Sequence, residues 1–492
     1  MRRILFFLLL SCSAAFAQSA DVYYEIFIRS FQDSDGDGIG DLSGATGRLD
    51  YLQELGVTGV WLTPLHPSPS YHGYDVTDYY EVHPDFGTLQ TFQTFVTEAH
   101  ARGIRVVMDL VVNHTSSEHP WFTAASAGEA AYRDYYLWSD EDPGWRGVSG
   151  APAWHAGEQG YYLGLFWSGM PDLNFRTPAV TAEVEEIARF WLELGVDGFR
   201  LDAIQHIVES TGGDIRNTPE TFAWVQDFEA FIKTVNPEAF VVGETWTDAG
   251  TVERYLERAD LDYAFDYPLW NALMDSLQAR NAGDLKQHLK ANGGNAERLA
   301  TFISNHDQIR PATSLSPLRR EVDRLKLAAG LLLTLPGTPY LYYGEEIGLP
   351  NGPGERDEEK RTPMRWTAEP GGGFSEAEPW YAFSTDEPAI SVAAQTADPD
   401  SLLSWYRDLV ALRKAHALDS APLELLESGR SVLAFRRRSE SELLVLANLG
   451  NKEALFDLSA LGAASATDLL SGAAFSEEIE LAKLAFYVLE LD

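Results

Sequence analysis

Four short apolar runs of this chain end in residues that can act as acids, bases or cation ligands. Asp109 and His114 follow the first run, Asp202 the second, Glu244 the third and Asp307 the fourth. Carboxylates gathered at one place could hydrolyse a glycosidic bond, with one attacking and a second serving as acid and base. Metal-assisted hydrolysis by a His/Asp cluster is the alternative. The spacings H-x-H and H-E-x-x-H, typical of such metal sites, are absent from the strand ends.

Arg200 and Asp202 lie two positions apart in the segment "GVDGFRLDA", residues 195–203. Residues two apart in a strand share a face, so these two side chains are expected to point the same way. An arginine beside a carboxylate favours the ionised form, which an attacking carboxylate requires. An ordinary ion pair that closes a layer of a barrel is the alternative for this segment taken alone.

Eight apolar runs predict strands, and amphipathic helical patterns separate most of them. The runs span residues 22–28, 56–64, 104–112, 196–203, 239–246, 261–267, 299–306 and 338–346. Alternating strands and helices indicate parallel pairing, and continuous apolar runs are typical of strands buried on both faces. Eight such units favour an α/β fold of the (β/α)8 TIM barrel type over a doubly wound sheet. The carboxyl ends of the strands would then meet at one mouth, where active sites form.

Further segments complete the predicted organisation. Residues 1–17 have the basic start, short apolar run and A-x-A ending typical of a signal peptide. The catalytic barrel is expected over residues 18–113 and 179–419. The stretch 114–178 is too long for a structureless loop and predicts a B subdomain inserted after strand 3. Short strands separated by Gly and Ser predict a C-terminal antiparallel β-sandwich domain over 420–492.

The composition limits the classes of partner. Against 37 Lys and Arg there are 74 Asp and Glu, a formal charge of -37, which argues against nucleic acid and anionic membranes. Solubility or adaptation to salt suffices to explain this charge. No later stretch has the length of a membrane helix, so we expect no integral membrane segment in the mature chain, and we expect a monomer.

The amino-terminal segment also predicts where the protein acts. A signal peptide predicts secretion, either extracellular or periplasmic. The only cysteine, Cys12, lies inside this segment, so no disulfide is expected in the mature chain. Anchoring as a lipoprotein through Cys12 is the alternative.

Taken together, the strand-end motifs resemble the signature regions of the α-amylase family of glycoside hydrolases (family 13). "DLVVNHTS" (109–116), "GFRLDAIQH" (198–206), "GETW" (243–246) and "FISNHD" (302–307) resemble four of these regions, in order. "MPDLNF" (170–175) resembles the fifth, at the end of the inserted domain. The resemblance runs from about residue 22 to the C-terminus and implies the TIM barrel with its inserted domain.

The resemblance also implies a role for each acid. Asp202 matches the catalytic nucleophile, Glu244 the general acid/base and Asp307 the acid that stabilises an oxocarbenium-like transition state. The residues implied to contact sugar rings are Tyr74, Asp75, His114, Arg200, His306 and Trp246. Retention of configuration would follow, with the two working carboxyl groups about 5–5.5 Å apart. Glu244 must start protonated, so we expect the nearby carboxylates to raise its pKa.

The segment "DSDGDGIGD" (33–41) places aspartates two apart with glycines between them. It begins like an EF-hand loop, but Gly44 stands where that motif needs its glutamate, and a solvated acidic turn is the alternative. The segment resembles a Ca²⁺ loop of part of the family, whose implied ligands are Asp33, Asp35, Asp37, Asp41 and the carbonyl of Ile39. A second Ca²⁺ site, between barrel and inserted domain, is partly matched by Asn113, Asp172 and His206, each of which could instead be a hydrogen-bonding residue. Oxygen-rich sites suit Ca²⁺ better than a transition metal.

The motifs point to two different substrate specificities. "MPDLN" is intermediate between the forms typical of oligo-1,6-glucosidases and of neopullulanases, and "RTPMRW" (361–366) and the 33–41 loop resemble the oligoglucosidases. "GETW", the second Ca²⁺ site and the signal peptide favour an extracellular α-amylase. We therefore expect an endo-acting α-amylase that cleaves α-1,4 bonds of starch and maltodextrins.

The alternatives are an α-glucosidase or oligo-1,6-glucosidase, and a neopullulanase-like enzyme. A non-catalytic sugar-binding homologue is a more distant alternative. Such homologues typically lose catalytic acids, whereas Asp202, Glu244 and Asp307 are all present.

Overall fold

The computed structural model describes residues 21–291, 295–315, 322–438 and 442–491. The predicted signal peptide, with Cys12, lies outside the described residues. Within those ranges, no helix combines the length and the apolar character that crossing a bilayer requires.

Eight parallel strands close into a barrel, which confirms the predicted TIM barrel. Around the barrel the order is β1-β2-β3-β7-β8-β9-β10-β11, so the strands follow one another in chain order and β11 returns to β1. The strands are β1 (Tyr23–Ile26), β2 (Gly59–Leu62), β3 (Arg105–Leu110), β7 (Gly198–Leu201), β8 (Phe240–Gly243), β9 (Tyr263–Phe265), β10 (Leu299–Thr301) and β11 (Thr338–Tyr342). Each of the eight predicted runs contains one of them.

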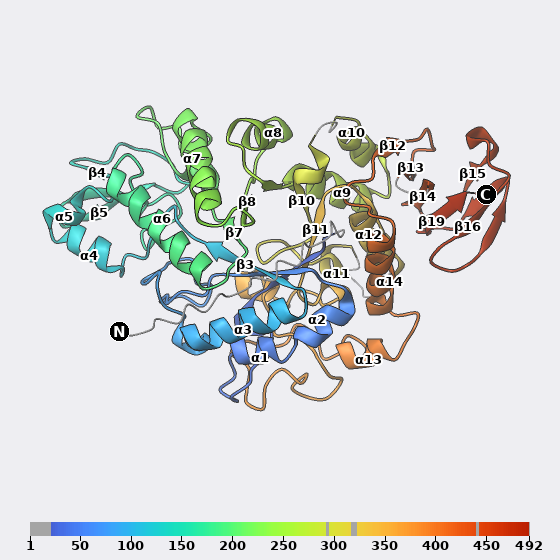
Figure 1. Ribbon diagram of the computed structural model, residues 1–492, viewed down its shortest axis with the longest axis horizontal. Helices are drawn as coiled ribbons and strands as arrows, with labels where there is room; N and C mark the ends of the chain where they lie inside the picture. The colour runs from blue at the N-terminus through green and yellow to red at the C-terminus, as the bar shows by residue number, and fades with distance from the viewer. Residues whose placement is uncertain (1–20, 292–294, 316–321, 439–441, 492) are drawn as a thin grey trace, which may run out of the picture.

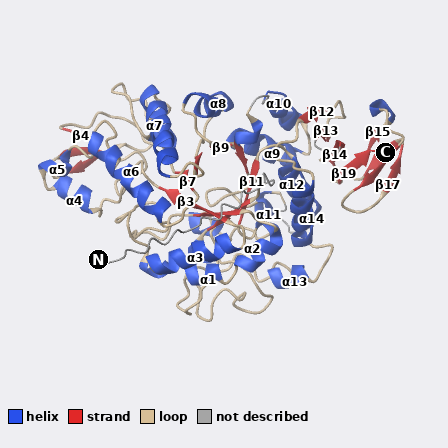
Figure 2. Ribbon diagram, viewed as in Figure 1, coloured by secondary structure: helices blue, strands red, loops and turns tan. Residues whose placement is uncertain are grey.

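Helices surround these strands (blue in Figure 2). Those of the barrel and its loops are α1 (Leu42–Thr46), α2 (Leu49–Leu55), α3 (Leu89–Ala101), α6 (Pro178–Glu193), α7 (Pro219–Val235), α8 (Ala249–Arg258), α9 (Tyr267–Ala279), α10 (Gly283–Ala291), α11 (Pro311–Ser314), α12 (Val322–Thr334), α13 (Val392–Thr396) and α14 (Leu402–Ala415). Helix α6 shows how local sequence sets the boundaries. It begins with Pro178, whose fixed φ suits a first helical position, and it ends just before Gly195, whose φ of 102° disfavours any other residue. The chain then turns directly into β7.

The alternation of side chains separates two cores. Tyr24 and Ile26 of β1 pack outwards in the large cluster shared with the helices, whereas Tyr23 belongs to an interior cluster with Trp61 and Phe240. The same alternation carries polar side chains into the interior near the strand ends. Strands β3 and β7 are in register there, with Asp109 opposite Arg200.

Two further β regions lie at opposite ends of the long axis of the molecule (Figure 1). Between β3 and β7 the chain forms α4 (Pro120–Ser126), α5 (Ala130–Arg133) and an antiparallel sheet of β4 (Trp138–Ser139), β6 (Gly160–Leu163) and β5 (Trp154–Gly157). This is the segment predicted to be the inserted domain; its exact boundaries, like those of the other domains, stay a prediction.

The C-terminal region is antiparallel, as predicted. Six strands form one sheet in the order β12 (Leu423–Leu425), β13 (Val432–Arg438), β14 (Glu442–Asn448), β19 (Phe486–Leu491), β16 (Ser465–Asp468) and β17 (Ala474–Ser476). A second pair, β15 (Ala454–Asp457) and β18 (Glu478–Leu481), shares an apolar core with that sheet, through Phe456 and Ile479.

Candidate active site

Arg200 is the centre of a buried group of carboxylates at the carboxyl ends of β3, β7 and β8. Its Nη1 donates to Asp109 Oδ1 at 2.9 Å and to Asp202 Oδ1 at 2.6 Å. Its Nη2 lies 3.1 Å from Glu244 Oε2. Arg200 is 1% exposed, so one guanidinium compensates three carboxyl groups away from water. Arg200 and Asp202 do share a face of the strand.

Glu244 uses its two carboxyl oxygens differently. Oε2 accepts a hydrogen bond from the Ala203 backbone N–H at 2.8 Å and lies beside Arg200, whereas Oε1 accepts only a long bond, 3.4 Å, from the Tyr267 hydroxyl. Ala203 has φ 49° and ψ 31°, a left-handed conformation that L-residues seldom adopt, and so its N–H reaches Glu244. With Oε2 held by the Ala203 N–H and by the charge of Arg200, Oε1 is the oxygen that can carry a proton.

Burial is the main reason that the pKa of Glu244 is raised. Arg200 opposes this rise, and the charges of Asp202 and Asp307 add to it. The expectation that neighbouring carboxylates raise this pKa is therefore correct in direction, but desolvation contributes more. Burial also raises the pKa of Asp202 above its ordinary value, and Arg200 again acts in the opposite direction.

Asp307 is held as an anion by two cationic partners. Its Oδ1 accepts from Arg361 Nη2 at 2.9 Å, and its Oδ2 lies 3.1 Å from His306 Nε2. Burial alone would raise the pKa of Asp307, but His306 and Arg361 outweigh burial and hold it well below the ordinary range. For His306 the signs are reversed. Burial lowers its pKa, but the charges of Asp307 and Glu25 outweigh burial and raise the pKa to about 10.

Asp307 is set apart as an anion by its two cationic partners, whereas burial raises the pKa of both Glu244 and Asp202, and both contact Arg200. Glu244 is suited to general acid catalysis by its Oε1, which accepts the long bond from Tyr267 and lies away from the guanidinium. Glycoside hydrolysis with two working carboxyl groups requires one carboxyl group that starts protonated and one that starts ionised.

A family model described as "Alpha amylase, catalytic domain" matches residues 25–420, most of the chain. The chain belongs to the α-amylase family. It is 39% identical over 448 residues to "Alpha-amylase 3" of Dictyoglomus thermophilum, an alignment that covers 89% of this chain and 86% of the relative. It is 33% identical over 519 residues to an oligo-1,6-glucosidase of Parageobacillus thermoglucosidasius, covering 89% and 91%. Among solved structures, an α-amylase from H.orenii matches with a TM-score of 0.85 and 37% identity, over 97% of this chain and all of that one.

The sugar-contact residues implied by the α-amylase resemblance lie at different distances from the acids. Tyr74 is part of the acid group: its ring stacks on His306, with centroids 5.4 Å apart, and its hydroxyl donates to Asp109 Oδ2 at 3.0 Å. His114 Nε2 lies 3.1 Å from the Tyr74 carbonyl, and burial lowers its pKa to about 4, so it is neutral. Asp75 is buried and accepts a hydrogen bond from the Ser68 hydroxyl at 2.6 Å.

Trp246 lies further out than the other predicted contact residues. It is 45% exposed and stacks on the ring of Tyr267, with centroids 4.9 Å and planes 7° apart. Because Tyr267 in turn contacts Glu244, Trp246 marks the side of the site on which Glu244 lies.

Sequence reasoning did not assign four residues that complete the site: Glu25, Asp109, Tyr267 and Arg361. The sequence did point to Asp109, because it opens the motif 109–116. Burial raises the pKa of Asp109 to about 7, against the opposing charge of Arg200. The sequence signal for Glu25 was weaker: it is a lone acid inside the apolar run 22–28. It accepts a 2.6 Å hydrogen bond from His306 Nδ1. Arg361 lies in the "RTPMRW" segment, whose contact with Asp307 no spacing rule predicts.

Replacing Tyr267 with Phe tests the assignment of Glu244 Oε1. The hydroxyl donates to the carboxylate, which favours the ionised form, so removing it raises the pKa of Glu244. The descending limb of the kcat/KM profile against pH should move to higher pH by roughly half a unit. The matched control is Tyr255→Phe on α8, which removes a hydroxyl that donates to Asn217 Oδ1. A shift to lower pH, or the same shift in the control, would contradict the assignment.

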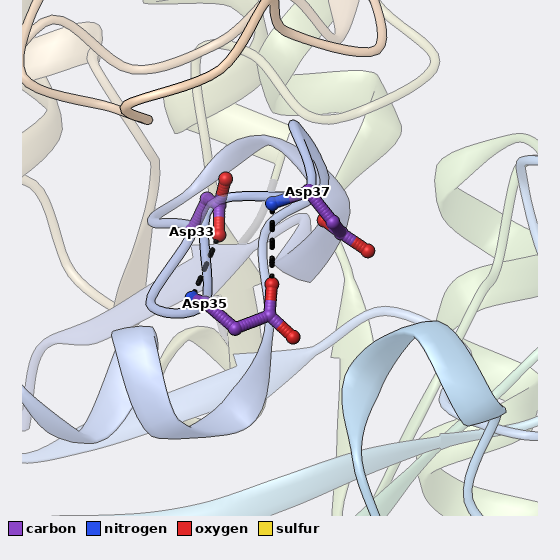
Figure 3. Close-up of side chains that lie close together, drawn as sticks. All are labelled: Asp33, Asp35 and Asp37. Carbon is purple, nitrogen blue, oxygen red and sulfur yellow. Dashed lines mark hydrogen bonds between the residues drawn. The ribbon is translucent and has the colours of Figure 1, made fainter.

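The predicted Ca²⁺ loop brings three of its aspartates together (Figure 3). Carboxylate oxygens of Asp33, Asp35 and Asp37 lie within 4.8 Å of one another. The charge of Asp37 is the main cause that raises the pKa of Asp35, which shows the repulsion that a cation would relieve. Asp41 lies outside this group, and its carboxylate caps α1. Ile39 donates its N–H to Asp37 Oδ1 at 2.7 Å.

The second predicted Ca²⁺ site contains buried acid oxygens without partners. Asn113 Nδ2 donates to the His206 carbonyl at 2.7 Å, so these two predicted ligands are adjacent. Asp172 Oδ1 accepts from the Leu165 N–H, but its buried Oδ2 has no partner in the structure, and neither has Oε1 of buried Glu209. Burial raises the pKa of Glu209 to about 8, and burial with the charge of Glu209 raises that of Asp172. Two such acids fit a cation site, and Glu209 is a residue that the sequence did not suggest.

Proposed function

We propose that this protein is a secreted, retaining, endo-acting α-amylase that cleaves α-1,4-glucosidic bonds of starch and maltodextrins. The observation that carries the proposal is the shared guanidinium of Arg200, which contacts both Asp202 and Glu244. Two carboxyl groups on one guanidinium lie close together, as the double displacement of a retaining enzyme requires. The signal-peptide pattern of residues 1–17 supports secretion.

In the proposed mechanism, Asp202 attacks the anomeric carbon while Glu244 Oε1 gives its proton to the departing glycosidic oxygen. The sugar is then bonded to Asp202, and Glu244, now ionised, takes a proton from the water that attacks this bond. Asp307 faces the positive charge that develops on the ring in both transition states, and its two cationic partners keep it ionised.

The choice of an endo-acting enzyme rests on the sequence identities to the relatives and on Trp246, the exposed aromatic residue beyond Glu244. Alpha-amylase 3 is more similar to this chain than the oligo-1,6-glucosidase is, at 39% against 33% identity. An α-glucosidase or oligo-1,6-glucosidase remains the second candidate because of that relative. The test is the product profile on starch, pullulan and isomaltose. Large oligosaccharides should appear early from starch; glucose alone from the start would overturn the endo assignment.

We also propose that the protein binds Ca²⁺ in the 33–41 loop and between Asn113, Asp172, Glu209 and His206. The three clustered carboxylates and the unpartnered acid oxygens support it, since Ca²⁺ takes six to eight oxygen ligands. Bound Ca²⁺ would supply positive charge that holds these segments together. The chemistry at the glycosidic bond would remain with the acids of the barrel.

Removing Ca²⁺ with a chelator should lower the melting temperature by about 5 °C, the order expected when a well-occupied site is emptied. In the double variant Asp35→Asn/Asp37→Asn the chelator should cause a smaller loss than in the wild type, because two loop ligands are gone and only the second site remains to be emptied. Asp227→Asn, an exposed position on α7, is the matched control. No shift in the wild type would count against a structural metal, and an equal shift in the double variant would place the metal outside the loop.

A further inference from the structure

Glu25 is a buried acid on β1 whose partner is a histidine of the active site. It lies two positions after Tyr23, whose ring belongs to the interior cluster, and in register with Trp61 of β2. Its side chain therefore faces the barrel interior. There Oε1 accepts from His306 Nδ1 at 2.6 Å and from the His306 backbone N–H at 3.2 Å. Glu25 and His306 are each 1% exposed, so bulk water does not compete for these bonds. The proposed mechanism assigns no step to Glu25.

The other ring nitrogen of His306 also carries a hydrogen. Nε2 lies 2.7 Å from the Tyr74 hydroxyl and 3.1 Å from Asp307 Oδ2. That hydroxyl has one hydrogen, which it donates to Asp109 Oδ2 at 3.0 Å, so toward His306 it can only accept. Asp109 Oδ2 is itself an acceptor, because Trp61 Nε1 also donates to it, at 3.3 Å. With hydrogens on both Nδ1 and Nε2, the imidazole is a cation.

Charged groups surround His306 on several elements. The anions are Glu25 on β1, Asp109 on β3, Asp202 after β7 and Asp307 beside the ring, and the cations are Arg200 and Arg361. Asp307 and Glu25 are the two acids that raise the pKa of His306 against burial. They act on opposite sides of the ring, because Glu25 holds Nδ1 whereas Asp307 faces Nε2. The charge of Glu25 therefore reaches Asp307 through the imidazole.

We infer that Glu25 is a positioning residue, which keeps His306 charged and so keeps an N–H, and not a lone pair, directed at Asp307 and Tyr74. The inference rests on the proposed function and deepens it, because Glu25 would set the alkaline limit of catalysis. A neutral His306 with its hydrogen on Nδ1 would turn the lone pair of Nε2 toward Asp307 Oδ2, and the two would repel each other. Stabilisation of the developing positive charge by Asp307 depends on a fixed position of its carboxylate.

The protonation of the two ring nitrogens measures the charge of His306 directly. In Glu25→Gln the amide oxygen can still accept from Nδ1, but the negative charge is gone. The pKa of His306 should therefore fall from about 10 to about 8. With ¹⁵N-labelled histidine at about pH 9, the wild type should show both ring nitrogens of His306 protonated, and Glu25→Gln should show one. The signals are identified by their absence from His306→Gln.

The same change should narrow the pH range of catalysis. α-Maltosyl fluoride is the substrate, because fluoride leaves without a proton and the descending limb of its kcat/KM profile does not report Glu244. Protonated His306 is the active form, so activity is lost as the pH rises through its pKa. The limb should lie near pH 10 in the wild type and about two pH units lower in Glu25→Gln. Glu25→Asp keeps the charge and should keep most of the wild-type range.

The matched control is Glu346→Gln, the same change at a buried acid that accepts from the Tyr24 hydroxyl on the outer side of β1. Its pH profile and its His306 signals should stay those of the wild type. An unchanged limb in Glu25→Gln would overturn the inference and leave the proposed function intact. A wild-type His306 with one protonated ring nitrogen at about pH 9 would overturn it too, and this result decides the question if Glu25→Gln does not fold. Absence of α-maltosyl fluoride turnover in the wild type would instead reject the proposed function, while the nitrogen signals would still test Glu25.

Discussion

The Asp202→Asn variant should lose starch hydrolysis by at least about 10⁴-fold while keeping the wild-type fold. An amide oxygen is a poor nucleophile, so the covalent step cannot proceed, and losses of this order follow removal of a nucleophile in other hydrolases. The fold should persist because asparagine has the same shape and Arg200 keeps Asp109 and Glu244 as partners. Release of reducing sugar and thermal unfolding measure the two effects.

The matched control for this variant is Asp227→Asn, which makes the same chemical change at an exposed position and should leave turnover unchanged. Normal turnover in Asp202→Asn would reject Asp202 as the nucleophile. Loss of activity together with a large fall in melting temperature would point to a structural ion pair with Arg200, the alternative that the sequence left open.

The Glu244→Gln variant should lose about 10³-fold of its kcat on starch and far less on α-maltosyl fluoride in the first chemical step. General acid catalysis contributes about 10²–10⁴-fold to reactions whose leaving group needs a proton. A sugar alkoxide needs that proton, whereas fluoride departs without it. Pre-steady-state release of fluoride measures the first step, and steady-state sugar release from starch measures the whole reaction.

The contrast between the two substrates is what identifies the acid. An equal loss on starch and on the fluoride would show that Glu244 positions the sugar or holds Arg200, because such a role does not depend on the leaving group. Tyr267→Phe serves as a comparison, since it leaves the carboxyl group in place and should change the pH profile more than the maximal rate.

Local sequence rules were sufficient for the barrel and for the central ion pair. Continuous apolar runs predicted all eight strands, and the two-residue period of a strand placed Arg200 and Asp202 on one face. Such rules could not predict the residues that contact Asp307 and His306 from distant parts of the chain. Arg361 lies 54 positions from Asp307, and Glu25 lies 281 positions from His306, so only the closed barrel brings them together.

The sign of a pKa shift could be anticipated from charges, but its main cause could not. Proximity of carboxylates was visible in the motifs, whereas the depth at which Glu244 lies is a property of the packed barrel mouth. The loop 33–41 shows a similar limit. The spacing grouped its aspartates as one set, and the folded loop assigns Asp41 to the cap of α1 while Asp33, Asp35 and Asp37 gather.

The most direct test of the account is to trap the sugar on the nucleophile. In Glu244→Gln, α-maltosyl fluoride should still react with Asp202, because fluoride needs no acid, but the product should hydrolyse slowly because the base is missing. Mass spectrometry of the digested protein should find one maltosyl group on the peptide that contains Asp202. A maltosyl group on another residue, or hydrolysis with inversion and no covalent intermediate, would contradict the mechanism.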